Sequence, residues 1–161
     1  MQIWRVNAQK RSLVKEDVPP AWEMLGGRGL SARILLDEVE HTCEPLGRRN
    51  KLVFAPGLLV GHMLSSCDRI SVGAKSPLTQ GIKESNAGVS TGLQLTRLGI
   101  KALIIEDLPD DQNWQVMVLS RQGVHFEPAD ELIGLGVYNS ARKLLERYGD
   151  KAAMAIIGPG G

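Results

Sequence analysis

Three short segments of the sequence combine residue types that could bind an anion or a metal. Residues 65–69 place Arg69 after a serine-rich loop, where its fork of donors suits a phosphate or a planar heterocycle, although a solvated surface arginine has the same pattern. Residues 84–88 surround Asn86, which could cap a helix, bind a metal through its carbonyls or form a turn. The glycine-rich residues 26–29 could hold an anion on free backbone N–H groups or form a helix–helix corner.

The residue patterns of the common catalytic centres do not occur in this sequence. The glycine-rich segment matches neither a P-loop nor the Rossmann spacing, and no nucleophile elbow occurs. The histidines have no metal-binding spacing, and Cys43 and Cys67 are too few to hold an iron–sulfur cluster, so we read them as buried or half-buried free thiols. From these residues the chain is expected to be a binding module rather than a self-contained enzyme.

Length and composition predict one soluble domain over residues 1–161. The 19 basic and 18 acidic side chains are interspersed and give a net charge of +1, so nothing favours nucleic acid or an anionic membrane as a partner. The apolar stretches are too short to span a bilayer, and the N-terminus lacks the layout of a signal peptide. We therefore expect a cytoplasmic protein.

Periodicity predicts the elements that must position these segments. We expect hairpins at 2–7 with 13–16 and at 114–119 with 123–126, and strands at 51–55, 70–75, 100–105 and 152–157. Within 70–75, Ile70, Val72 and Ala74 alternate with Ser71, Gly73 and Lys75, the period of a half-buried strand. Helices are predicted around Trp22 to Leu25, along the apolar stripe from Leu30 to about Val39, over 90–98 and over 137–148. Turn residues occupy 77–86.

These elements predict an α+β fold with mainly antiparallel sheets and a few packed helices, because hairpins are frequent and no regular βα alternation occurs. Residues 1–55 and 112–157 are coarsely similar, since each reads as a hairpin, a helix and a hydrophobic strand. The final Gly-Pro-Gly-Gly follows an apolar run and suggests that the domain is cut within a loop that should continue.

The order of several longer motifs resembles the N-terminal domain of the tungsten-containing aldehyde:ferredoxin oxidoreductase family over essentially the whole chain. The most specific stretch runs from Arg69 through Lys-Ser-Pro-Leu-Thr to Ser-Asn-Ala-Gly88. Supporting matches are Gly-Gly-Arg-Gly-Leu-Ser at 26–31, Pro-Leu-Gly at 45–47 leading to Ala-Pro-Gly at 55–57, Leu-Gly-Ile-Lys-Ala-Leu-Ile-Ile-Glu at 98–106 and Ile-Gly-Pro-Gly-Gly at 157–161.

The resemblance implies a sheet-rich base that carries a tungsten (or molybdenum) bis-pyranopterin. Arg69 resembles the arginine that contacts a pterin, and Asn86, Ala87 and Gly88 resemble the cofactor-contacting loop. The backbone carbonyl of Asn86 would help to hold a magnesium ion that bridges the two pterin phosphates. Glycine at 88 would let the cofactor approach the backbone.

The reaction that the resemblance implies is electron transfer from an aldehyde, oxidised to a carboxylic acid, to ferredoxin. The family's 4Fe-4S cluster has no ligands in this chain, so the remaining C-terminal domains or a separate subunit must complete the enzyme, and no catalytic residue is assigned here. A homodimer is compatible with the sequence, and the residues favour no particular aldehyde and neither of the two metals. A non-catalytic pterin-binding or assembly module and an inactive structural fragment are the alternatives.

The sequence departs from the family pattern before Arg69 and after Gly88. Cys67 and Asp68 stand where family members commonly have small residues before the arginine. Asp68 would bring negative charge towards a phosphate-rich cofactor unless it pairs with Arg69 or points outward. Val89 stands where a second glycine is expected and could tighten the loop.

Overall fold

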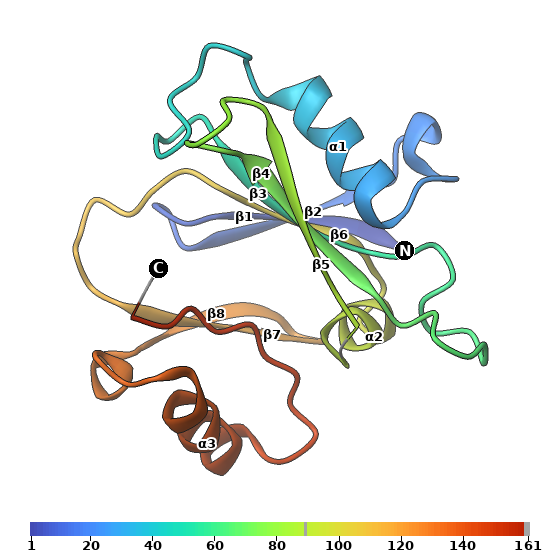
Figure 1. Cartoon of the computed structure of the whole chain (residues 1–161). Helices are drawn as coiled ribbons and strands as arrows, with labels where there is room; N and C mark the ends of the chain where they lie inside the picture. Colours follow the sequence, from blue (N-terminus) through green and yellow to red (C-terminus); the bar gives the residue numbers. More distant parts are fainter. Residues whose placement is uncertain (89, 160–161) are drawn as a thin grey trace.

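The computed structural model describes residues 1–88 and 90–159, which form one six-stranded sheet, one two-stranded hairpin and three α-helices (Figure 1). The large sheet has the order β2-β1-β6-β3-β4-β5, and β7 pairs with β8. Only the β1–β6 pair is parallel among the pairs described, which confirms the predicted α+β class with mainly antiparallel sheet. The strands are β1 Gln2–Asn7, β2 Ser12–Asp17, β3 Lys51–Pro56, β4 Ile70–Lys75, β5 Ile82–Ala87, β6 Ile100–Glu106, β7 Gln115–Ser120 and β8 Gly123–Pro128. The helices are α1 Gly27–Glu38, α2 Ser90–Arg97 and α3 Val137–Tyr148, with short 3-10 turns at Pro20–Trp22 and Asp130–Leu132.

The inner strands of the large sheet are covered on both faces, and their side chains alternate between two cores. On one face, α1 covers a core that includes Leu30, Ile34, Val53 and Ile104. On the other face, α2 and the β7–β8 hairpin cover a second core, and α3 lies beyond that hairpin (Figure 1). The second core contains Trp4, Val6, Ile70, Leu95, Ile100 and Leu103, with Met117, Leu119, Val124 and Phe126 of the hairpin packed against it.

Helix α1 approaches strand β4 unusually closely, which reverses the burial that the alternation in 70–75 suggested. Ser71, Gly73 and Lys75 are buried beneath α1, whereas Val72 and Ala74 are only half-buried on the opposite face. Gly73 permits the contact, because a Cβ there would lie 2.1 Å from the Ser31 hydroxyl oxygen. The small residues of β4 therefore carry the closest helix–sheet packing, which hydrophobic periodicity cannot reveal.

Three sequence predictions are corrected. Residues 82–86 of the turn predicted at 77–86 form strand β5 together with Ala87, and this strand pairs with β4 from Ile70↔Ala87 to Lys75↔Ile82. Residues 152–157, predicted as a strand, are not in a strand. The short helix expected through Leu25 is a 3-10 turn that ends at Trp22. In the first two cases the outcome depends on whether a neighbouring strand offers a free edge, not on local apolar content.

Most other predicted elements are confirmed, including both hairpins, the central strand β6 and the long helix α3. The coarse similarity of the two halves is visible in the order of their elements. The first half has β1, β2, a 3-10 turn and α1, and the second has β7, β8, a 3-10 turn and α3, although the described part of the second unit lacks the hydrophobic strand. In the described residues no helix has the length and apolar character needed to cross a bilayer.

Candidate cofactor-binding site

The pairing of β4 with β5 brings the predicted binding residues together at one end of the sheet. The register places Ile70 opposite Ala87 and Ser71 opposite Asn86. Arg69 immediately precedes β4, and Gly88 immediately follows β5. Arg69, Asn86, Ala87 and Gly88 are all exposed. Asn86 and Ala87 thus belong to an edge strand rather than to the loop that we expected.

Arg69 contacts two of the other predicted residues. Its Nε donates a hydrogen bond to Asn86 Oδ1. Its Nη1 lies close to Gly88, since a Cβ atom added to that glycine would be 3.2 Å from Nη1. Within the described residues the side chain's recorded hydrogen bond uses Nε, which leaves both Nη groups able to donate to a ligand. This arrangement suits a phosphate or another oxyanion.

The glycine-rich corner at the N-terminus of α1 lies beside the same end of β4. A Cβ on Gly27 would lie 3.6 Å from Ser71 Oγ, and Gly27 has a φ of +53°, which favours glycine. Gly26 packs against loop backbone, because a Cβ there would lie 2.4 Å from the Leu58 nitrogen. Arg28 is 78% exposed, and its Nη2 lies 3.9 Å from Glu84 Oε2. All three segments singled out in the sequence therefore meet around Ser71 and Glu84.

The positions that depart from the family pattern have different outcomes. Asp68 neither pairs with Arg69 nor projects freely, because its Oδ1 accepts a 3.2 Å hydrogen bond from the Gly61 N–H within the preceding loop. The prediction for Val89 lies outside the described residues. Cys43 is a buried free thiol and Cys67 a half-buried one, as predicted. No group of three or more potential metal-ligating side chains occurs in residues 1–88 and 90–159.

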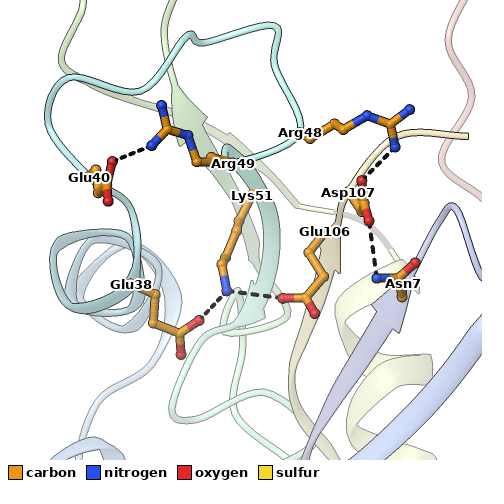
Figure 2. Close-up of a pocket in the computed structure, with 8 residues that line it drawn as sticks. All are labelled: Asn7, Glu38, Glu40, Arg48, Arg49, Lys51, Glu106 and Asp107. Atoms are coloured by element: carbon orange, nitrogen blue, oxygen red, sulfur yellow. Dashed lines mark hydrogen bonds and ion pairs between the residues drawn. The ribbon is translucent and has the colours of Figure 1, made fainter.

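A separate cavity of about 460 Å³ opens at the other end of the sheet (Figure 2). The register places Lys51 opposite Glu106 there, whereas Pro56, at the far end of β3, is opposite Ile70. Lys51 Nζ lies 2.7 Å from Glu38 Oε2 and 3.0 Å from Glu106 Oε2. The remaining lining residues are Asn7, Glu40, Arg48, Arg49 and Asp107.

The charges in this cavity are already paired with one another. Arg5 Nη1 donates to Glu38 at 2.8 Å, and Arg49 Nη1 lies 2.7 Å from Glu40. Partial burial alone would raise the pKa of Glu38, but hydrogen bonds from Arg5 and Lys51 together lower it below the ordinary 4.5. We interpret the charged residues around this cavity as a structural ion-pair network. We assign the candidate site to the end of the sheet at Arg69, where the guanidinium donors face solvent.

Comparison with known proteins identifies the family to which this fold belongs. Residues 3–161 match the aldehyde ferredoxin oxidoreductase N-terminal domain, and the chain belongs to that family. It is 33% identical to the tungsten-containing aldehyde ferredoxin oxidoreductase of Pyrococcus horikoshii, over 99% of the chain and 26% of that protein. It is 31% identical to the Pyrococcus furiosus protein of the same name, over 91% of the chain and 24% of that protein.

A solved structure shows the same fold. The active site complex BamBC of benzoyl coenzyme A reductase, in complex with 1,5-dienoyl-CoA, matches with a TM-score of 0.84 and 27% identity, over 91% of this chain and 22% of that one. The chain therefore spans about a quarter of the length of the relatives that it matches. By their names, the curated relatives are tungsten-containing oxidoreductases.

Sequence reasoning assigned no role to Ser71 or Glu84, which connect the site residues. The sequence presents Ser71 as one of the alternating positions of residues 70–75 and Glu84 as part of the turn at 77–86. The signal that could have identified them is the two-residue spacing of Glu84 and Asn86, which places both side chains on the same face once 82–87 is a strand.

Proposed function

We propose that this chain is the N-terminal part of an oxidoreductase and supplies one face of the binding site for a tungsten (or molybdenum) bis-pyranopterin. The observation that carries the proposal is the meeting of Arg69, Asn86 and Gly88 at one exposed end of the β4–β5 pair. Tungsten in the names of the family relatives supports the same cofactor.

The residues fit such a cofactor in three respects. The Nη groups of Arg69, which have no recorded hydrogen bond within residues 1–88 and 90–159, suit a phosphate oxygen, because an arginine fork donates two hydrogen bonds at once. Gly88 leaves room beside that guanidinium. Because β5 is an edge strand, alternate backbone carbonyls face away from the ladder, so the Asn86 carbonyl is our candidate ligand for a magnesium ion on the phosphates, with Ala87 beside it.

The proposed overall reaction converts an aldehyde and water into a carboxylic acid, two protons and two electrons, with ferredoxin as the electron acceptor. When bound, the tungsten pterin supplies the two-electron redox centre. The chain's own residues bind and orient the cofactor's phosphate end. We propose that the substrate pocket and the iron–sulfur cluster come from the polypeptide that completes the enzyme, whether as further domains or as a separate subunit.

Substitution of Arg69 tests the cofactor site. The chain is co-produced with the completing polypeptide in a host that makes the tungsten cofactor, and the purified protein is assayed for tungsten by mass spectrometry and for pterin by fluorescence. We expect Arg69→Ala to lower the affinity for cofactor by about ten-fold or more, because a hydrogen bond from a charged donor contributes about 1.5–3 kcal/mol.

The control is Arg121→Ala, which removes an exposed arginine from the β7–β8 turn. Equal tungsten and pterin contents in the Arg69→Ala protein and the control would rule out the role that we assign to Arg69. Absence of both tungsten and pterin from the unsubstituted assembly would leave the inactive fragment as the better description.

A further inference from the structure

A buried serine links the residues of the candidate site. Ser71 is only 1% exposed, on the side of β4 that faces α1. Its hydroxyl donates a 2.6 Å hydrogen bond to Glu84 Oε1 and accepts one of 3.1 Å from Asn86 Nδ2. Asn86 Oδ1 in turn accepts from Arg69 Nε. A continuous relay therefore runs from Glu84 through Ser71 and Asn86 to Arg69.

The backbone register explains why one serine reaches two residues of β5. Ser71 is directly opposite Asn86, while Glu84 is opposite Gly73. Because Gly73 has no side chain, the Glu84 carboxylate can lean along the strand to the Ser71 hydroxyl. The glycine that admits α1 therefore also leaves space for this hydrogen bond.

The chemistry at the two ends sets the direction of every hydrogen bond in the relay. An ionised carboxylate only accepts, so the Ser71 proton is committed to Glu84. A guanidinium only donates, so Arg69 must face the Asn86 oxygen and not its NH2 group. The Asn86 amide consequently has one orientation in which all its partners match. Reversing it would set donors against donors at Arg69.

We infer that Glu84 and Ser71 are positioning residues for the cofactor site, because they hold Asn86 and the Arg69 guanidinium in their binding orientation without touching the ligand. This inference rests on the proposed function. Glu84 also lies 3.9 Å from Arg28, so the two arginines and one glutamate of this group sum to a charge of +1. The carboxylate thus organises the site while leaving it attractive to a phosphate.

The relay itself is tested by NMR on the 161-residue chain, with the Arg69 Nε–H and the Asn86 side-chain amide as reporters. We expect the Arg69 Nε–H to exchange with solvent about five- to ten-fold faster in Ser71→Ala, as loss of one side-chain hydrogen bond of about 1 kcal/mol predicts. Glu84→Gln should give two environments for the Asn86 amide, because a glutamine amide can either accept from Ser71 or donate to it.

Ser85→Ala is the matched control, since Ser85 lies on the same strand and is exposed. It should leave both reporters unchanged, and circular dichroism of each variant checks that the chain is folded. An Arg69 Nε–H that exchanges at the same rate in Ser71→Ala and in Ser85→Ala would overturn the relay.

The positioning role is tested by tungsten and pterin content of the completed protein in a double-mutant cycle. We expect Ser71→Ala to lower cofactor content several-fold, and Ser71→Ala with Arg69→Ala to lower it no further than Arg69→Ala alone, because Ser71 acts through Arg69. Additive losses would overturn the inference and indicate a general structural effect. If Arg69→Ala alone has no effect, the proposed cofactor site fails, whereas the exchange rates still report on the relay.

Discussion

At the scale of single residues, Lys75 is a cation buried on the α1 side of β4. It is 7% exposed, and its Nζ donates to the backbone carbonyls of His41 and Cys43, the latter at 2.6 Å. These bonds hold the connection between α1 and β3 against the sheet. A lysine at one of the polar positions of an alternating strand therefore anchors a loop.

Replacing this lysine should destabilise the protein. We expect Lys75→Met to lower the free energy of unfolding by about 2–4 kcal/mol, because two carbonyls in a buried setting lose their donor. Urea unfolding measures the change, with Lys83→Met on exposed β5 as the control. A loss no larger than that of the control would show that water replaces the ammonium at little cost.

At the scale of secondary-structure elements, the contact of α1 with β4 determines where the site lies. Ser31 and Gly73 form the closest point of that contact, and Ser31 Oγ is fully buried with no hydrogen-bond partner among the described residues. The same helix begins at Gly27, beside Ser71. The packing of one helix on one strand thus places the glycine-rich corner at the same end of the sheet as Arg69.

Substitutions at this contact should have opposite effects on stability. Gly73→Ala should cost about 1–3 kcal/mol, because the new methyl group overlaps the Ser31 hydroxyl. Ser31→Ala should stabilise by about 1 kcal/mol, since it removes an unpartnered buried hydroxyl and improves helix propensity. Thermal and urea unfolding of the single and double variants test this. A Gly73→Ala loss that Ser31→Ala does not reduce would contradict the proposed overlap.

At the scale of the whole molecule, one ion-pair network joins distant parts of the chain. Arg5 of β1 lies within 3.2 Å of Glu16 of β2, Glu38 of α1 and Glu106 of β6. Lys51 of β3 shares the last two carboxylates. Four strands and one helix therefore meet in a half-buried network of alternating charges at the end of the sheet opposite Arg69.

This network predicts an acid-sensitive stability. The folded-state pKa of Glu38 lies below 4.5, so its contribution is fully present above pH 4.5 and is lost as the pH falls through the folded-state value. We expect the free energy of unfolding to decrease over that interval and Glu38→Gln to flatten the decrease. Urea unfolding at a series of pH values measures it, with Glu146→Gln on the exposed side of α3 as control. Identical acid slopes for wild type and Glu38→Gln would assign the dependence to other groups.

The amino-acid sequence by itself determined the elements whose signals are local. The 3.6-residue pattern of Val137–Tyr148, the turn residues of both hairpins and the apolar run of β6 were sufficient, because each encodes its own period or turn. The order of motifs also identified the family and pointed to Arg69, Asn86, Ala87 and Gly88 as candidate site residues.

Only the tertiary structure decided which of the ambiguous segments pair and which side chains meet. Residues 82–87 are mostly polar and become a strand because β4 offers them an edge, whereas the apolar residues 152–157 join no strand among the described residues. Ser71 and Glu84 meet because Gly73 opens space between them in the β4–β5 register. Such contacts depend on register and on helix–sheet distance, which are properties of residues far apart in the sequence.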